Sequence, residues 1–345
     1  MPVLVITSDR FGEHTPPPGH PERPARQDVM DAVAARWREL GGLVAEPAPA
    51  PRGAIRRVHS DRFIETLESA AGRAVMLDPD TFTSAESWDV TQLAAGAAIW
   101  AVDAVLDGQS TRAAALVRPP GHHSNRDQAR GFCLVNNAAV AAARALDRGL
   151  ARVAIVDVDV HHGNGTQEIF EADPRVLYVS THQWPFYPGT GAAADVGTGA
   201  GRGFTVNVPM ERGSTDADYD LVFEELVIPV TSRFNPELLI ISAGFDAHEE
   251  DPIGAMRMSA GGFARLTGRL CEVADATASG RAVLVTEGGY SLKALAESLV
   301  ASLGALDGRP APAAAEGAGA GGDRRRGRLA AQQARAAQAS FWRGL

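Results

Sequence analysis

Short apolar runs and longer amphipathic stretches alternate along the chain. Runs rich in β-branched residues and bounded by turn residues are typical of buried strands. We expect strands at 3–6, 113–117, 152–156, 176–180, 204–208, 238–242 and 282–286. Apolar residues at helical spacing predict helices at 26–40, 62–71, 89–106, 137–146, 219–234 and 260–276. The alternation predicts an α/β fold, a largely parallel sheet with helices on both faces.

Composition narrows the classes of protein that fit this pattern. The chain has 345 residues, 45% of them hydrophobic, which is enough for a large core. It contains no run of about 18 apolar residues, and its start lacks the basic region of a signal peptide. Two cysteines, Cys133 and Cys271, suit a reducing compartment. We therefore expect a cytoplasmic protein without a membrane span.

The composition changes near Pro310, which suggests a boundary between a domain at 1–308 and a tail at 309–345. Residues 311–322 are almost wholly Ala, Gly and Pro, which is typical of a linker. An Arg-rich and Ala/Gln-rich segment follows and ends in Phe341 and Trp342. We expect either a short helix that docks through these two aromatic residues or a mobile tail, and we favour peripheral packing over partner binding.

Residues 157–166, with the sequence D-V-D-V-H-H-G-N-G-T, follow one of the predicted strands. Side chains two positions apart in an extended chain point the same way, so Asp159 and His161 share a face and Asp157 lies one step behind. A carboxylate and an imidazole aimed together resemble half of a metal site. A polar strand end that caps the next helix explains the same residues. The stretch alone does not decide between these alternatives.

Three further predicted strands also end in reactive groups. They lead to R-P-P-G-H-H at 118–123, to S-A-G-F-D at 242–246 and to E-G-G-Y at 287–290. In parallel α/β sheets, ligands bind at the carboxyl ends of the strands. Four such ends, each with a metal ligand or a proton-transfer group, favour an active site over helix caps.

These motifs resemble those of the zinc-dependent histone deacetylase family, which includes the acetylpolyamine amidohydrolases. Besides the four segments above, G-F-C at 131–133 and P-G-T-G at 188–191 occur in the family's order, and the resemblance covers about residues 1–305. The sequence is similar to the class II-like bacterial branch of this family. The resemblance implies an arginase-like fold, an eight-stranded parallel sheet with helices on both faces, and makes 1–308 a deacetylase catalytic domain.

The resemblance also implies the metal ions. Asp159, His161 and Asp246 would be the zinc ligands, with water or substrate in the open position. An Asp/Asp/His set accepts ferrous iron as well. A structural potassium ion would be held by Asp157 and the Ser180 hydroxyl, together with backbone carbonyls.

Catalytic roles follow from the same resemblance. His123 would be the general base that polarises the water, oriented by Asn164 where some family members carry Asp. His122, oriented by Asp157, would assist electrostatically. Tyr290 would donate its phenol to the substrate carbonyl and stabilise the oxyanion.

The substrate tunnel would be lined by Gly131, Phe132 and Tyr187, and Gly289 would help to place Tyr290. The expected reaction is hydrolysis of a linear N-acetyl amide on a small-molecule or peptide acyl-amine substrate. Apolar walls suit a methylene chain whose charged end stays in water.

Substrate choice is less defined. In the eukaryotic polyamine deacetylase of this branch, a glutamate seven residues after the last zinc ligand reads the distant ammonium. Ile253 occupies that position here, which favours acetyl-lysine or a related acyl-lysine. Glu249 and Glu250 lie nearby and would be able to replace that glutamate, so acetylpolyamines remain the alternative.

Two more remote hypotheses are a two-manganese ureohydrolase and a silent acyl-amine binding protein. The first needs additional bridging carboxylates, and the second is disfavoured because the complete catalytic set is present. The formal charge of −9 argues against direct nucleic-acid binding. No membrane contact is expected, and a homo-oligomer is left open.

The remaining candidates are expected to be structural. His162 points away from His161 on an extended chain, which favours a buried structural role. Four other histidines are expected in loops or at the surface: His14, His20, His59 and His248. No residues that would activate a thiolate are visible near Cys133.

Overall fold

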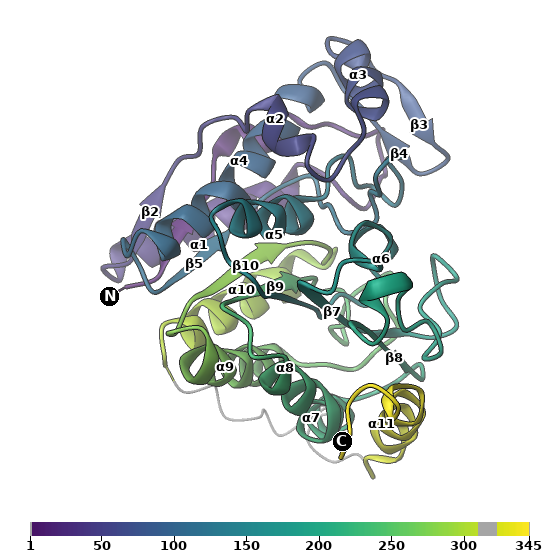
Figure 1. Cartoon of the computed structure of the whole chain (residues 1–345). Coiled ribbons are helices and arrows are strands. Elements are labelled where there is room, and N and C mark those ends of the chain that lie inside the picture. Colours follow the sequence, from purple (N-terminus) through teal and green to yellow (C-terminus); the bar gives the residue numbers. More distant parts are fainter. Residues whose placement is uncertain (1, 310–322, 345) are drawn as a thin grey trace.

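The computed structural model describes residues 2–309 and 323–344. Its centre is an eight-stranded sheet in the order β2-β1-β5-β10-β9-β6-β7-β8, with every neighbouring pair parallel (Figure 1). The strands are β1 (Leu4–Ile6), β2 (Leu43–Ala45), β5 (Arg112–Ala115), β6 (Val153–Asp157), β7 (Val176–Gln183), β8 (Thr205–Met210), β9 (Leu238–Ala243) and β10 (Ala282–Thr286). A separate antiparallel hairpin joins β3 (Met76–Asp78) and β4 (Thr81–Phe82). The predicted parallel α/β architecture is confirmed.

Helices cover both faces of this sheet. They are α1 (Ala25–Glu39), α2 (Arg52–Ile55), α3 (Asp61–Ala70), α4 (Ser87–Leu106), α5 (Asn137–Asp147), α6 (Asn164–Phe170), α7 (Asp216–Val222), α8 (Ile228–Phe234), α9 (Ala260–Thr277), α10 (Leu292–Leu306) and α11 (Arg325–Gln338). Alternate residues of each strand point to opposite faces. Ala154 and Val156 of β6 therefore join a core with α1 and α7–α11, whereas Val153 and Ile155 join a core with α2–α5.

The structure adds elements that the apolar pattern did not indicate. β2 has three residues at the sheet edge with Leu43 exposed, so it carries no buried run. Helix α6 has seven residues and begins with Asn164 and Gly165, both poor helix formers. The hairpin, α2 and α10 were also not predicted. The predicted helix at 219–234 is a continuous run in which a π-helical turn, η3 (Phe223–Val227), joins α7 to α8.

Side-chain caps set the starts of several helices. Asn136 accepts from the backbone N–H of Ala139 at 2.9 Å and caps α5 behind the R-P-P-G-H-H loop. Ser291 caps α10 directly after Tyr290. Each cap satisfies a backbone donor that has no intrahelical partner. The two caps therefore hold the loops that carry the predicted catalytic groups.

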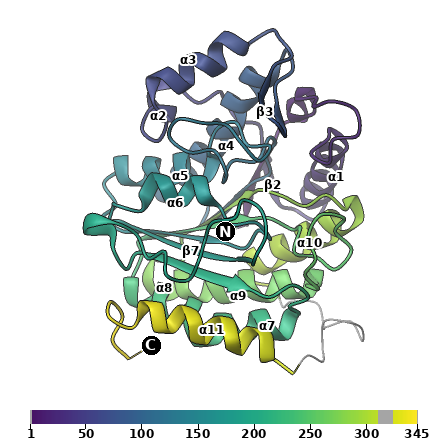
Figure 2. The same ribbon diagram turned by 90° about the vertical axis from the view of Figure 1, so that its right-hand side faces the viewer.

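The C-terminal segment packs as a helix against the edge of the domain. Helix α11 lies beside α7 and β8 (Figures 1 and 2). After it, the indole N–H of Trp342 donates to the Gly203 carbonyl at 2.8 Å, and its ring meets Phe204 edge-on. This is the docked alternative of the sequence prediction. The predicted linker at 311–322 lies outside the described residues, and the division at 308/309 remains a prediction.

Helix α4 is long and apolar enough to cross a membrane by length and composition. Two thirds of its most apolar window (67%) is buried inside the protein. Its small residues, among them Ala94, Ala97 and Ala101, are fully buried against the sheet. Helix α4 therefore has the features of a core helix.

Candidate metal centre and active site

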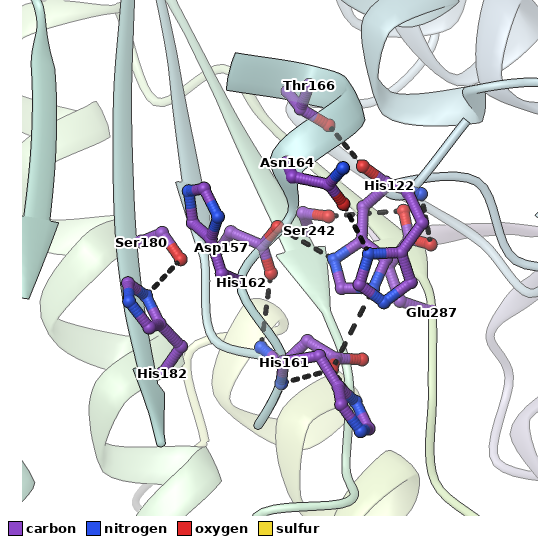
Figure 3. Close-up of polar contacts among 12 residues, drawn as sticks. His122, Asp157, His161, His162, Asn164, Thr166, Ser180, His182, Ser242 and Glu287 are labelled. Atoms are coloured by element: carbon purple, nitrogen blue, oxygen red, sulfur yellow. Dashed lines mark hydrogen bonds and ion pairs between the residues drawn. The ribbon is translucent and has the colours of Figure 1, made fainter. Parts of the chain in front are cut away.

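The predicted site residues converge at the carboxyl ends of the central strands. His122 and His123 follow β5, Asp157 ends β6, and Asp246 follows β9. β9 lies between β10 and β6, so residues far apart in sequence meet at one edge (Figure 3). Chain order places β6 and β9 far apart, and only the sheet order makes them neighbours.

Asp159, His161 and Asp246 form a buried cluster. One ligand atom from each lies within 4.8 Å of the others. The His161 Nδ1 atom is 3.0 Å from Asp159 Oδ1 and 3.3 Å from Asp246 Oδ2. The structure thus brings together the three residues that the sequence analysis assigned to one metal ion.

The other oxygens of the two aspartates are held by backbone donors. Asp246 Oδ1 accepts from the Val160 N–H at 2.8 Å, and Asp159 Oδ2 accepts from the Gly288 N–H at 2.9 Å. Asp246 Oδ2, by contrast, is buried and accepts no hydrogen bond from the residues that the structure describes. A buried carboxylate oxygen without a donor is costly unless a cation binds it. The donor set therefore fits a divalent metal ion.

Electrostatics support the same conclusion. Burial, with the nearby charge of Asp159, raises the pKa of Asp246 to about 7. Burial opposes the charged form of His161, but its hydrogen bond to Asp159 and the nearby Asp246 carboxylate outweigh it and raise the pKa to about 9. Two repelling carboxylates in a buried site are stabilised by a positive charge between them.

Two glycines leave the space that these carboxylates occupy. A Cβ on Gly244 would lie 1.9 Å from Asp159 Oδ2, and one on Gly288 would lie 2.1 Å from Asp246 Oδ2. Side chains at either position would displace the carboxylates. The Gly residues of the S-A-G-F-D and E-G-G-Y segments are therefore part of the metal-site geometry.

His122 lies beside this cluster and is oriented by Asp157. Its Nδ1 is 3.0 Å from Asp157 Oδ2, and its Nε2 is 3.8 Å from Asp159 Oδ1 (Figure 3). Burial opposes charge on the ring, but Asp159 and Asp157 outweigh it and raise the pKa to about 10. His122 is therefore a cationic imidazolium in this arrangement.

His123 is held by Asn164 and has the opposite character. Its Nδ1 lies 2.8 Å from the Asn164 side-chain oxygen. Burial, and then the charges of His122 and His161, hold the pKa of His123 well below its ordinary value. A neutral ring whose Nδ1 donates to Asn164 leaves the Nε2 lone pair free to accept a proton.

The reverse orientation of the Asn164 amide would fix the other tautomer of His123. In that orientation the amide nitrogen of Asn164 donates to His123 Nδ1, and the amide oxygen accepts from Arg130 at 2.7 Å. The base role of His123 requires the first orientation, in which the amide nitrogen donates to Glu168 at 3.3 Å.

Tyr290 is buried at the edge of the metal cluster. Burial, and then the negative charge of Asp246, raise the pKa of its phenol well above the ordinary value. The phenol therefore keeps its proton and is able to donate it in a hydrogen bond. Arg26 lies under the ring, with its guanidinium carbon 5.1 Å from the ring centroid.

Aromatic rings lie around His123, Tyr290 and His161, and the substrate tunnel itself stays a prediction. Tyr187 meets His123 edge-on at 5.0 Å between ring centroids, and Phe132 meets Tyr290 at 5.8 Å. Phe186, which no sequence motif indicated, stacks on His161 with 5.1 Å between the ring centroids. The Gly131 N–H donates to Asp80 at 3.1 Å. The carbonyl of Gly289 faces inward and accepts from Arg26 at 2.7 Å.

Asp157 and Ser180, the predicted potassium ligands, are partners in the β6–β7 register. The hydroxyl of Ser180 lies 2.9 Å from His182 Nδ1 (Figure 3), and Asp157 Oδ2 also accepts from the Tyr178 hydroxyl at 3.2 Å. The register brings the two residues side by side.

Glu287 was not among the predicted site residues, yet its carboxylate holds the loop that carries His122. One carboxylate oxygen accepts from the backbone N–H groups of Gly121 at 2.6 Å and His122 at 3.0 Å. The other accepts from the Ser242 hydroxyl at 3.1 Å (Figure 3). Glu287 also clusters with His122 and Cys133. Both carboxylate oxygens of Glu287 and the Nδ1 atom of His122 already have hydrogen-bond partners. This second cluster therefore has a structural role.

A buried ionic network links the N-terminal loop to the Tyr290 loop. Glu22 binds Arg118 and Arg26, and Arg26 also donates to the Glu287 carbonyl at 2.6 Å. The charge of Arg118 outweighs the effect of burial and lowers the pKa of Glu22 to about 2. The i, i+4 spacing of Glu22 and Arg26 is a local pattern that predicts their ion pair. No sequence pattern indicates the contact of Arg26 with the Glu287 carbonyl.

Three of the other histidines, His14, His59 and His248, lie in loops, as expected. They are buried there rather than exposed. Both ring nitrogens of His59 have hydrogen-bond partners. Nδ1 lies 2.7 Å from the Asn125 carbonyl, and Nε2 accepts from the Asn136 N–H at 3.0 Å. His162 is buried and structural, as expected.

Comparisons with known proteins agree with this geometry. The family model described as "Histone deacetylase domain" matches residues 20–306. The chain is 39% identical over 296 residues to a "Probable deacetylase" of Archaeoglobus fulgidus, a match that covers 85% of this chain and 82% of the relative.

Two further relatives extend the comparison. The chain is 40% identical over 346 residues to "Polyamine deacetylase HDAC10" of Homo sapiens, which covers 94% of this chain but only 50% of that protein. Among solved structures, the "Crystal Structure of HDA15 HD domain" matches with a TM-score of 0.90 and 34% identity, covering 99% of this chain and 95% of the other.

Proposed function

The chain belongs to the histone deacetylase family, and we propose that it hydrolyses N-acetylated amines with a zinc ion bound by Asp159, His161 and Asp246. Family membership makes it a deacetylase. The metal identity, the roles of individual residues and the preferred acyl-amine are the proposed parts.

The observation that carries the proposal is the buried Asp159/His161/Asp246 cluster with its unpartnered Asp246 oxygen. Three protein ligands and an open position are the pattern of a catalytic zinc site. A zinc ion there would supply a Lewis acid that polarises the acetyl carbonyl and acidifies the attacking water. The same donors accept ferrous iron, which is the alternative metal.

The chain's own residues would perform the proton transfers. Neutral His123 would take the proton of the attacking water at Nε2 while Asn164 holds Nδ1. Tyr290 would donate its hydroxyl to the carbonyl oxygen as negative charge develops there. Cationic His122, oriented by Asp157, would stabilise the same charge. The amine would leave after it receives a proton from an imidazole.

The entrance would bind the methylene chain of the substrate between Phe132 and Tyr187, with the Gly131 backbone close to His123. Such walls exclude water from the amide and leave the charged end of the substrate outside. This geometry fits any acyl-amine with an unbranched methylene chain, and Ile253 favours acetyl-lysine or a related acyl-lysine as the proposed substrate.

Hydrolysis of acetylpolyamines is the second candidate. One relative at 40% identity is named a polyamine deacetylase. Ile253 and the ion pair of Glu250 with Lys293 at 2.8 Å speak against an ammonium-reading carboxylate at this part of the entrance. Glu249 is exposed there and remains able to bind an ammonium.

For potassium, the proposed ligands are Asp157 and Ser180, supported by their pairing across β6 and β7. The bound ion would hold the strand ends that carry the zinc ligands.

We expect the Tyr290→Phe variant to lower kcat for N-acetylated lysine substrates by about 10²–10³-fold, because an oxyanion donor is lost. The measurement is steady-state hydrolysis by the zinc-loaded protein over acetyl-lysine peptides, longer-acyl lysines and acetylated polyamines. Metal content by mass spectrometry should equal that of the unaltered protein.

The loss must exceed that of a surface control, Phe341→Leu, on the distant C-terminal segment. Unchanged turnover in Tyr290→Phe would remove the phenol from the mechanism. Absence of hydrolysis for every substrate in the zinc-loaded and iron-loaded protein would refute the proposed function.

A further inference from the structure

A small hollow opens at the entrance directly beside Tyr290. It has a volume of about 300 Å³ and is lined by Pro16, Pro17, Pro18, Gly19, His20, Pro21, Arg23, Pro24, Pro252 and Tyr290. Because Tyr290 lines this hollow and also belongs to the proposed reaction site, the hollow adjoins that site. We call these ten residues the proline pocket.

Prolines determine what the walls of the proline pocket offer a ligand. Six of the ten lining residues are Pro, and Pro has no backbone N–H. The ring also fixes φ, so the walls are stiff and little ordering is needed on binding. These wall positions therefore supply apolar surface but no backbone donor for an anion.

His20 is the one histidine among the ten lining residues, and its ring nitrogens are already hydrogen-bonded. His20 Nδ1 accepts from the Glu22 N–H at 3.1 Å, which leaves Nε2 to donate to the Asp80 carbonyl at 3.1 Å. Both ring nitrogens therefore have partners, and the ring packs edge-on against Phe132.

Arg23 is different. Its side chain is exposed, and within residues 2–309 and 323–344 its guanidinium forms no ion pair or side-chain hydrogen bond. None of the ten lining residues is acidic. A carboxylate would find a planar, bidentate donor there, whereas an ammonium would meet only a like charge.

Carboxylates do occur elsewhere on the entrance, on the side of Phe132. Asp80 accepts from the Gly131 N–H and from the Thr81 hydroxyl, and Asp78 accepts from the Asp80 N–H at 3.4 Å. Acidic groups thus lie beside Phe132, whereas the lining of the proline pocket itself contains Arg23 and no carboxylate.

We propose that the proline pocket is a carboxylate subsite, in which Arg23 selects acyl-amines that carry a carboxylate near the distal end of the chain. Nε-acetyl-lysine with a free α-carboxylate is one such substrate, and an acetyl-lysine peptide with a neighbouring acidic side chain is another. Acetylpolyamines carry only ammonium groups and are disfavoured. This inference rests on the proposed deacetylase function and specifies its substrate class.

The test compares substrates that differ only in the carboxylate. Nε-acetyl-lysine, its α-carboxamide and N-acetylcadaverine, the decarboxylated analogue, share the same acetamide and methylene chain. We expect kcat/KM for the acid to exceed that for the carboxamide by about fivefold, as for a partly exposed ion pair. Arg23→Gln should bring this ratio close to one.

Arg38→Gln is the matched control. Arg38 is an exposed arginine at the other end of α1, about 20 Å along the helix at 1.5 Å per residue, and it forms no ion pair with the described part of the chain. This variant should keep the ratio of the unaltered protein. Peptides with Asp or Asn after the acetyl-lysine distinguish a side-chain carboxylate from the α-carboxylate, because preference for Asp would identify the former.

Equal kcat/KM for acid and carboxamide, with no preference between the Asp and Asn peptides, would overturn the subsite. A preference that survives Arg23→Gln would also overturn it. Activity on N-acetylcadaverine alone would retain the deacetylase function and refute the inference. Inactivity on all substrates would refute the proposed function itself.

Discussion

At the scale of single residues, the partner of each side chain decides its chemistry. His122 and His123 are adjacent in sequence and both are buried. The first faces Asp157 and has its pKa raised to about 10, whereas the second faces Asn164 and stays neutral. Two groups of the same type thus acquire different protonation states, as acid–base catalysis requires.

The clearest residue-scale prediction concerns Asp246. Asp246→Ala removes one of three ligand groups, and loss of even an outer partner of a metal ligand costs about 10–100-fold in affinity. We expect metal content after dialysis to fall from one ion per chain to near zero. Asp28→Ala, on the exposed side of α1, should keep a full complement. Full occupancy in Asp246→Ala would contradict the ligand assignment.

At the scale of elements, the site is assembled from loops that other loops hold. Asp251 follows Asp246, a proposed metal ligand, in the loop after β9. Its Oδ2 accepts from the N–H groups of Tyr290 at 2.7 Å and Ser291 at 3.2 Å. Its Oδ1 accepts from Ile253 at 2.9 Å within its own loop. One carboxylate therefore joins the loop that carries a ligand to the loop that carries the phenol.

We expect Asp251→Asn to act through Tyr290, as a positioning residue. The amide would direct an N–H group toward backbone donors, which loosens the Tyr290 loop and lowers kcat by about tenfold with little change in KM. In the Tyr290→Phe background, the same change should have little further effect on kcat. Asp28→Asn should leave kcat unaltered.

Additive losses in the Asp251→Asn/Tyr290→Phe double variant would show that Asp251 does not work through the phenol. Steady-state kinetics of the two single variants and the double variant complete this cycle.

At the scale of the whole molecule, the fold is the arginase-like α/β sheet of its family, and the C-terminal helix closes one side of it. The N-terminus of α11 is fastened by Asp218, which accepts from the Gly327 N–H at 2.8 Å. Buried Ala330, Ala331 and Ala334 form the contact face, and Gln338 donates to the Thr205 carbonyl at 2.7 Å. Small side chains allow this close approach.

Gly327→Ala tests how tightly α11 is packed. The added Cβ would lie 2.4 Å from the Asp218 carbonyl oxygen, which is backbone and unable to move aside. We expect the free energy of unfolding in urea to fall by about 1–3 kcal/mol. Gly268→Ala in α9, where a Cβ meets no atom within 4 Å, should raise it by about 0.5–1 kcal/mol.

Equal effects of Gly327→Ala and Gly268→Ala would mean that α11 is not packed closely against α7. Limited proteolysis provides a second readout, because a released α11 should be cleaved faster in the first variant only.

Local patterns in the sequence determined much of this protein. The apolar runs located seven of the eight strands of the main sheet, because a strand buried on both faces is apolar throughout. The motif segments 157–166 and 242–246 predicted the three proposed metal ligands, which the structure brings into one cluster, because ligand chemistry depends on residue type. The three-residue strand β2 and the short helix α6 escaped, since neither has enough buried residues to leave a periodic signal.

The tertiary structure decided which of these segments meet. Sheet order places β9 beside β6 and so brings Asp246 to Asp159, and no local pattern encodes strand neighbours. The contacts of Arg26 with the Glu287 carbonyl and of Asp251 with the Tyr290 N–H are to backbone groups, which every residue carries. Such contacts leave no trace in residue type, so only the folded chain reveals them.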